Sequence, residues 1–134
     1  MSNPTASQYY LGLISGTSAD GIDAALVRFD GGETSPLQAE LIAARTLPWQ
    51  PDVRARLVWL GQGGALDSLD ELGELDAQVG EAFADAALAI LGDAGIAPSR
   101  VAAIGSHGQT VRHRPYVAHP FSLQIGDAGR IVER

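Results

Sequence analysis

Eight residues with the sequence G-T-S-A-D-G-I-D, at positions 16–23, separate two short apolar segments. Residues 9–15 form a mostly apolar run of the kind found in buried strands, and residues 22–29 form a second run directly after the turn. So short a connection favours an antiparallel hairpin. The two glycines of the turn allow the backbone to approach a ligand closely and to adopt positive φ. The chain is therefore expected to open with a hairpin whose turn can face a ligand.

The residues of this turn suit a phosphate group. Successive backbone N–H groups in such a turn form a concave surface that binds phosphate oxygens, and Thr17 and Ser18 add hydroxyl donors. Asp20 and Asp23 would repel a phosphate, but they suit Mg²⁺ held through water, or side-chain hydrogen bonds that fix the turn. The same residue types are also common in ordinary hairpin turns. From these residues alone, a phosphate site and an ordinary turn are equally good interpretations.

The rest of the pattern predicts a mixed α/β fold. We expect further strands at 37–46, 100–106 and 120–125, and helices at 52–60, at 66–91 and from 128 onward. A helical interpretation of 37–45 remains open. Residues 66–91 repeat apolar side chains at three- and four-residue steps, which is typical of one amphipathic helix, or of two that separate near Gly73. Asp30-Gly31-Gly32 is expected to end the second strand, and Asp52 to cap the first helix.

A second polar segment, S-H-G-Q-T at positions 106–110, lies at the end of the strand expected at 100–106 and is predicted to form a loop. The end of a strand is where α/β proteins place groups that contact ligands. Three of its side chains suit sugar hydroxyls and amide groups: His107, Gln109 and Thr110. Two arginines that suit an anionic group come next, Arg112 and Arg114. In the alternative interpretation, the histidine and glutamine satisfy buried backbone groups and the arginines lie on the surface.

Other clusters carry weaker signals. The three histidines, at 107, 113 and 119, lie six residues apart, which fits no face of a helix, so no metal site is expected from them. Glu74 and Asp76 lie within the expected long helix, where acidic residues usually form a solvated face. Asp127 follows a strand and is placed to cap the next helix, although a functional carboxylate at that strand end remains open.

Composition narrows the classes of function. The chain has no cysteine, which excludes disulfides, thiolate metal sites and a cysteine nucleophile. All nine basic residues are arginine, so a lysine-based phosphate loop and a Schiff-base enzyme are excluded as well. A net charge of −7 argues against nucleic acid as the main partner. No apolar run is long enough to cross a bilayer and the N-terminus resembles no secretion signal, so we expect a cytoplasmic protein.

Four stretches together resemble the anhydro-N-acetylmuramic acid kinase family, in that family's order and roughly its spacing. They are L-G-L-I-S-G-T-S-A-D-G-I-D-A-A-L-V (11–27), E-L-D-A-Q-V-G-E-A-F-A (74–84), I-G-S-H-G-Q-T-V-R-H-R-P (104–115) and F-S-L-Q-I-G-D (121–127). The G-T-S-x-D-G-x-D turn is specific when it occurs together with S-H-G-Q-T. The chain departs from the family at Ala19, where a larger apolar residue is usual, and at Ala128, where proline is frequent.

The resemblance implies an actin-like (ribonuclease H-like) ATPase fold whose two lobes close over ATP, with residues 1–134 as the N-terminal part of such a domain. In the family the first hairpin turn is the first phosphate loop. ATP and Mg²⁺ are thus expected at Gly16, Thr17, Ser18, Ala19, Asp20, Gly21, Ile22 and Asp23. The sugar is expected at Ser106, His107, Gln109 and Thr110. The family also suggests a homodimer. From the charge and the lack of a long apolar run, neither nucleic acid nor a membrane is expected as a partner.

The implied reaction opens the 1,6-anhydro ring of the muramic sugar and phosphorylates its 6-oxygen from ATP, which gives N-acetylmuramic acid 6-phosphate in cell-wall recycling. Members of the family are nearly three times as long, and their catalytic aspartate, second phosphate loop and adenosine pocket lie beyond the part matched here. We therefore assign no catalytic base and expect the isolated chain to lack kinase activity. A non-enzymatic actin-like module, or a related kinase or phosphatase with another substrate, remains an alternative.

Overall fold

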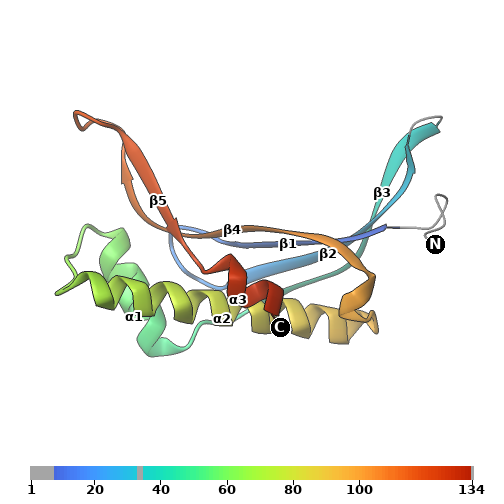
Figure 1. Ribbon diagram of the computed structural model, residues 1–134, viewed down its shortest axis with the longest axis horizontal. Helices are drawn as coiled ribbons and strands as arrows, with labels where there is room; N and C mark the ends of the chain where they lie inside the picture. Colours follow the sequence, from blue (N-terminus) through green and yellow to red (C-terminus); the bar gives the residue numbers. More distant parts are fainter. Residues whose placement is uncertain (1–7, 33–34, 134) are drawn as a thin grey trace.

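A computed structural model describes residues 8–32 and 35–133 of the chain. Its centre is one five-stranded sheet with the strand order β3-β2-β1-β4-β5 (Figure 1). The strands are β1 (Gln8–Ser15), β2 (Ile22–Gly32), β3 (Ser35–Leu47), β4 (Val101–Arg114) and β5 (Phe121–Ile125). β1 is antiparallel to β2 and parallel to β4, and the β2–β3 and β4–β5 pairs are antiparallel. The predicted antiparallel opening is confirmed, and the helical interpretation of 37–45 is wrong.

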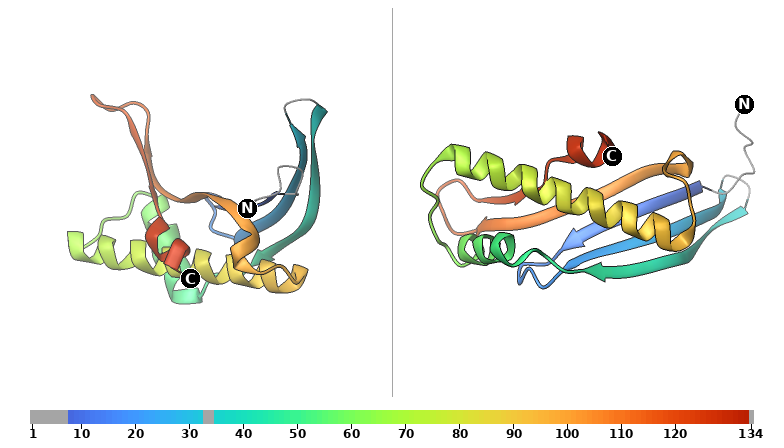
Figure 2. Two further views of the ribbon diagram at one scale, coloured as in Figure 1. Left: turned by 45° about the vertical axis from the view of Figure 1, so that its right-hand side comes forward. Right: turned by 90° about the horizontal axis from the view of Figure 1, so that it is seen from below.

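Three helices lie on one side of this sheet (Figure 1). They are α1 (Pro51–Gly61), α2 (Leu69–Ala94) and the short α3 (Ala128–Glu133), with a 3₁₀ turn at Pro98–Arg100 before β4. Figure 2 shows α2 crossing beneath the strands, with α1 beside its N-terminal half. α2 is continuous through Gly73, so the interpretation as two separate helices is wrong. None of the helices in the described residues is long and apolar enough to span a bilayer.

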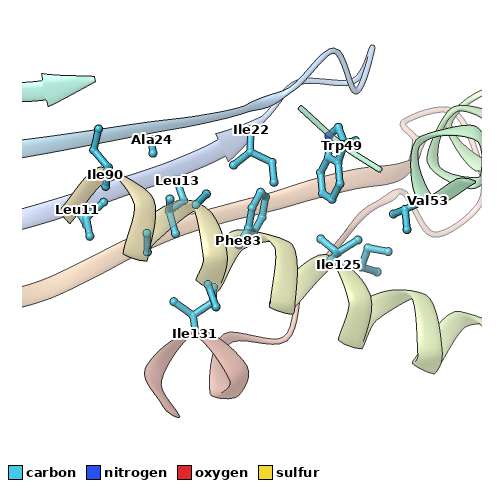
Figure 3. Packing of buried hydrophobic residues seen from close by; sticks show 14 of the residues in the cluster. Leu11, Leu13, Ile22, Ala24, Trp49, Val53, Phe83, Ile90, Ile125 and Ile131 are labelled. Carbon is cyan, nitrogen blue, oxygen red and sulfur yellow. The ribbon is translucent and has the colours of Figure 1, made fainter. Parts of the chain in front are cut away.

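The hydrophobic core fills the space between α2 and the sheet (Figure 3). Successive residues of a strand point to opposite faces, and in β1 Leu11 and Leu13 are buried whereas Gly12 and Ile14 are exposed. From α2, every third or fourth residue enters the same core. The contributing side chains on the helix include Leu75, Val79, Phe83, Ala86 and Ile90. The apolar period seen in the sequence is therefore the packing face of α2.

The opposite face of the sheet is not covered by any element that the structure describes. The β2–β3 and β4–β5 hairpins bend away from the helices on this side, so that the sheet is the floor of a trough (Figure 1). Ile14 is 44% exposed on this floor, and Ser106 and His107 of β4 are also exposed. This open face matters for the site because several of the predicted site residues lie on it.

Several element boundaries differ from the expectations. β2 continues through 30–31 to Gly32, because it goes on pairing with β3 across an irregular register there. The N-cap residue of α1 is Gln50, and Asp52 lies inside the first turn. The expectation that Asp52 caps this helix is therefore wrong. α2 begins after Ser68, whose hydroxyl accepts a hydrogen bond from the first turn, and it ends at Ala94. Helix ends depend on such single contacts, which an apolar period does not reveal.

Candidate functional site

The turn between β1 and β2 is closed by a hydrogen bond from the N–H of Ala19 to the carbonyl of Gly16 (3.0 Å). Ala19 has a φ of 52°, in the left-handed region that costs a residue with a Cβ atom about 1–2 kcal/mol. Its side chain is fully buried, so this position combines a strained backbone with a packed methyl group. The expectation that the glycines supply the positive φ is wrong, since neither Gly16 nor Gly21 has one.

Gly21 is required by close packing. A Cβ atom at Gly21 would lie 2.6 Å from Cγ2 of Thr46 and 3.1 Å from the carbonyl oxygen of Leu47. The glycine therefore lets the start of β2 lie directly against the end of β3. Ile22 follows and is buried in the core, so this member of the predicted nucleotide site anchors the turn from below.

The carbonyl groups of the turn are held by two side chains from distant parts of the chain. Arg54 of α1 donates from Nε to the carbonyl of Ala19 (2.9 Å) and from Nη2 to that of Ser18 (3.4 Å). Gln109 of β4 donates from Nε2 to the carbonyl of Gly16 (2.8 Å). Three carbonyls of one short turn are thus engaged by protein donors.

Among the described residues, the N–H groups of Thr17 and Ser18 have no hydrogen-bond partner. Both residues are exposed, and no hydrogen bond within residues 8–32 and 35–133 uses either N–H group. A turn whose carbonyls are engaged while adjacent N–H groups stay free has the polarity of an anion-binding site. The donors present here therefore fit the phosphate oxygens of a nucleotide.

The two carboxylates of the G-T-S-A-D-G-I-D segment, Asp20 in the turn and Asp23 at the start of β2, have different partners. Asp20 accepts a hydrogen bond from the Ser18 hydroxyl (2.8 Å) and lies 3.4 Å from the Arg54 guanidinium, with 79% of its side chain exposed. Asp23 accepts a hydrogen bond from the Thr46 hydroxyl of β3 (2.5 Å). In the described part of the chain, no three histidine, cysteine or acidic side chains gather as a metal-binding group. Mg²⁺ held through water at these exposed carboxylates remains a prediction.

The S-H-G-Q-T segment lies inside β4, so the predicted loop is wrong. Ser106 pairs with Leu13 of β1, but Gln109 pairs with Ser15, so β4 carries one extra residue in this stretch. Gly108 occupies the irregularity with a φ of 74°, in the manner of a β-bulge that contains a left-handed glycine. The bulge lets β4 continue into its hairpin with β5 instead of ending at the motif.

Because of this bulge, the predicted sugar-binding residues lie in two different environments. Ser106 and His107 line a hollow of about 620 Å³ on the open face of the sheet, together with Asp23. Gln109 is 1% exposed, bonds to the turn, and keeps its Oε1 without a partner in the described residues. Thr110 accepts a hydrogen bond from the amide of Gln124 (3.1 Å). The structure therefore places Ser106 and His107 around the same hollow as Asp23, and it brings Gln109 to the turn at 16–21.

Arg112 does not meet an open anion site. Its guanidinium donates to the carbonyl of Gly64 (2.6 Å) and to that of Leu60, which belong to the end of α1 and the segment after it. Arg114 lies further along the β4–β5 hairpin and donates to the neighbouring His113 carbonyl (3.1 Å). The arginine nearest the turn is Arg54, which the sequence analysis did not single out. Its only signal was a position early in an expected helix.

A contact between two of the family-like stretches was also missed. The carboxylate of Asp76 in α2 accepts a hydrogen bond from the N–H of Gly126 (2.6 Å). The backbone carbonyl of Asp76 accepts a second one from the N–H of Asp127 (3.3 Å). One turn along the helix, a Cβ atom at Gly80 would lie only 2.7 Å from the carbonyl oxygen of Asp127. The interpretation of Asp76 as part of a solvated face is wrong. The expected cap is confirmed, because Asp127 Oδ1 accepts from the N–H of Gly129 (3.0 Å).

Replacing Gly73 or Gly80 by alanine should change the free energy of unfolding in opposite directions. Gly73→Ala, which meets no atom within 4 Å, should raise the free energy of unfolding by about 0.5–1 kcal/mol because alanine favours a helix. Gly80→Ala should lower it by about 1–3 kcal/mol, since its methyl group would overlap the backbone of Asp127. Urea unfolding of both variants measures the difference. Equal effects would show that the close approach of Asp127 to α2 is not required.

Comparison with known proteins places the whole described chain in one family. A family model described as anhydro-N-acetylmuramic acid kinase matches residues 8–134. A relative of that name from Xanthomonas campestris pv. campestris (strain 8004) is 58% identical over 99% of this chain and 35% of its own length. Relatives of the same name from Xylella fastidiosa (strain Temecula1) and Vibrio vulnificus (strain YJ016) are 54% and 43% identical, each over 34% of its own length. The chain spans about a third of these relatives, and it belongs to the anhydro-N-acetylmuramic acid kinase family.

Proposed function

We propose that this chain is the N-terminal part of an ATP-dependent anhydro-N-acetylmuramic acid kinase with an actin-like fold. The observation that carries the proposal is the turn at 16–21, whose carbonyls are engaged by Arg54 and Gln109 while the N–H groups of Thr17 and Ser18 are free. The family match over residues 8–134 supports the same assignment. We propose a cytoplasmic role in peptidoglycan recycling, which follows from the sugar named for the relatives.

The residues of the turn would hold the nucleotide. The N–H groups of Thr17 and Ser18 would bind phosphate oxygens, and Asp20 and Asp23 would hold Mg²⁺ through water. ATP supplies the phosphoryl group that the sugar receives. Catalysis of such a transfer rests mainly on positioning and on stabilising charge, and the free N–H groups of this turn would serve both purposes.

Ser106 and His107 would face the sugar from the open side of the sheet. Both residues are exposed and line the same hollow as Asp23, and hydroxyl and imidazole groups suit the hydroxyl groups of an amino sugar. Opening the 1,6-anhydro ring requires a base that activates water at the anomeric carbon, while the freed 6-oxygen accepts the phosphoryl group. We assign that base to the part of a full-length kinase that lies outside this chain. The product would be N-acetylmuramic acid 6-phosphate.

A fusion protein tests this proposal. Residues 1–134 would replace the matching third of the Xanthomonas campestris relative, and sugar phosphate would be identified by mass spectrometry after incubation with ATP, Mg²⁺ and the anhydro sugar. We expect ATP-dependent product from the fusion and none from the isolated chain or from the relative's remaining part alone. A well-folded fusion that binds ATP but phosphorylates only another sugar would contradict the proposed substrate. Turnover by the isolated 134-residue chain would contradict the division of the site.

A further inference from the structure

Arg54 makes more contacts with the phosphate turn than any other side chain in the described residues. It lies in the first turn of α1, where its own N–H donates to the carbonyl of Gln50 (2.9 Å). Its guanidinium reaches back to two adjacent carbonyls, those of Ser18 and Ala19, and to the carboxylate of Asp20. A planar guanidinium holds its donors in a fixed fork that suits several acceptors at once, whereas an ammonium group is a compact charge with rotatable donors.

These contacts fall on the strained part of the turn. The strained left-handed residue is Ala19, and the shortest Arg54 bond, at 2.9 Å, is to the carbonyl of that residue. Strained backbone persists where surrounding groups over-determine it. On the other side of the turn, Gln109 holds the carbonyl of Gly16 (2.8 Å). The segment with free N–H groups, Thr17 and Ser18, therefore lies between two fixed ends.

The positive charge of Arg54 also affects how well the turn can accept a phosphate. Asp20 stands in the turn and would repel a phosphate, and the nearby guanidinium offsets that charge. The pair is exposed, at 46% for the Arg54 side chain and 79% for Asp20, and exposed ion pairs contribute little to stability. Stability of the fold alone therefore gives a weak reason for Arg54 at this position. Orientation of the turn gives a stronger one.

We propose that Arg54 is a positioning residue for phosphate binding. Its guanidinium holds the carbonyls of Ser18 and Ala19 toward α1 and so fixes one end of the turn, while Gln109 holds the carbonyl of the Gly16–Thr17 peptide at the other end. Together these contacts keep the N–H groups of Thr17 and Ser18 available to an anion. The inference rests on the proposed function, because it assumes that the turn receives a phosphate. It differs from that proposal in assigning the geometry of the turn to a residue outside it.

The test uses Arg54→Lys, which keeps the charge and removes the planar group of donors, with Arg56→Lys as the matched control. Arg56 lies on the same helix and bonds to Gln78 of α2, away from the turn. Two NMR measurements are made on the 134-residue chain: hydrogen exchange of the Ala19 N–H, and the shifts of the Thr17 and Ser18 amides during titration with inorganic phosphate. Thermal unfolding is followed in parallel, because a merely structural role would lower stability without a selective change in phosphate affinity.

With Arg54→Lys we expect Ala19 exchange to become roughly tenfold faster and the phosphate dissociation constant to rise by a similar factor, as for the loss of one charge-assisted hydrogen bond. Arg56→Lys should change neither. In the fusion with the Xanthomonas relative, KM for ATP should rise about tenfold in Arg54→Lys while KM for the sugar stays constant.

The outcomes separate this inference from the proposed function. If the unsubstituted chain responds to phosphate and Arg54→Lys responds equally, the positioning role is overturned and the proposed function stands. If phosphate shifts no amide in the unsubstituted chain, the phosphate role of the turn is overturned, whatever the exchange rates show. An equal rise of both KM values in the fusion would also overturn the positioning role, because it would point to a general loss of structure.

Discussion

Replacing Phe83 by alanine is expected to lower the free energy of unfolding by about 3–5 kcal/mol, as for other buried phenylalanines. The ring is fully buried on α2, and its centroid lies 5.9 Å from that of Trp49. It also borders Gly126, where a Cβ atom would lie 3.4 Å from the ring. The substitution would therefore open a cavity where α2, the segment after β3 and the end of β5 meet. Urea unfolding followed by circular dichroism measures the loss.

Leu69→Ala provides the control for this change. Leu69 is also a large apolar residue of α2, but its side chain is 80% exposed, so its truncation should change the free energy of unfolding by no more than about 0.5 kcal/mol. If Phe83→Ala leaves too little folded protein to measure, Phe83→Leu should show a smaller loss at the same position. A loss for Phe83→Ala no larger than that for Leu69→Ala would contradict the central place of the ring in the core.

The same ring supports the turn at 16–21 indirectly. The indole N–H of Trp49 donates to the hydroxyl of Ser15 (3.2 Å), and both residues are buried. Ser15 is the last residue of β1, so it sits directly before Gly16. The core beneath the sheet is therefore continuous, through Trp49, with the strand end from which the turn begins. A cavity at Phe83 should loosen the turn as well as the fold.

The parts of the fold that follow apolar periodicity could be predicted from the sequence. α2 buries one face along its length, and that burial produces the repeat of apolar residues between 66 and 91. The β1–β2 hairpin was predictable because its two apolar runs are joined by a turn rich in glycine and polar residues. The position of the turn at 16–21, between the paired strands, follows from the same pattern.

Features that depend on distant contacts could not be predicted. Gln109 holds the carbonyl of Gly16 across 93 residues of sequence, and Arg54 holds that of Ala19 across 35. The positive φ occurs at Ala19, whose carbonyl one of these contacts holds, whereas residue preference alone pointed to the glycines. Asp76 likewise looked like a surface acid because its partner, the N–H of Gly126, comes 50 residues later. A single sequence contains no signal for such pairs.

Gly108→Ala is expected to lower the free energy of unfolding by about 2–4 kcal/mol. This loss is the sum of two costs, that of a strained backbone and that of a steric overlap of the new methyl group. Gly108 has a φ of 74°, which a residue with a Cβ atom adopts at a cost. Its Cβ atom would also lie 2.5 Å from the carbonyl oxygen of Ile125, and that backbone belongs to the paired strand β5. The strands would have to separate or shift. Gly105→Ala is the control, because it lies in the same strand with no atom within 4 Å of its Cβ position.

The pair of glycine variants also decides what the glycine of S-H-G-Q-T contributes. If Gly108 mainly shapes the bulge, Gly108→Ala should lower stability and also weaken phosphate binding at the turn, because Gln109 follows it and holds the carbonyl of Gly16. Gly105→Ala should change neither property, although it lies beside Ser106 on the open face. Urea unfolding and the phosphate titration of the Thr17 and Ser18 amides measure the two effects. Weakened phosphate binding in both variants at full stability would place the role of the motif in the open hollow, and not in the bulge that joins β4 to the turn.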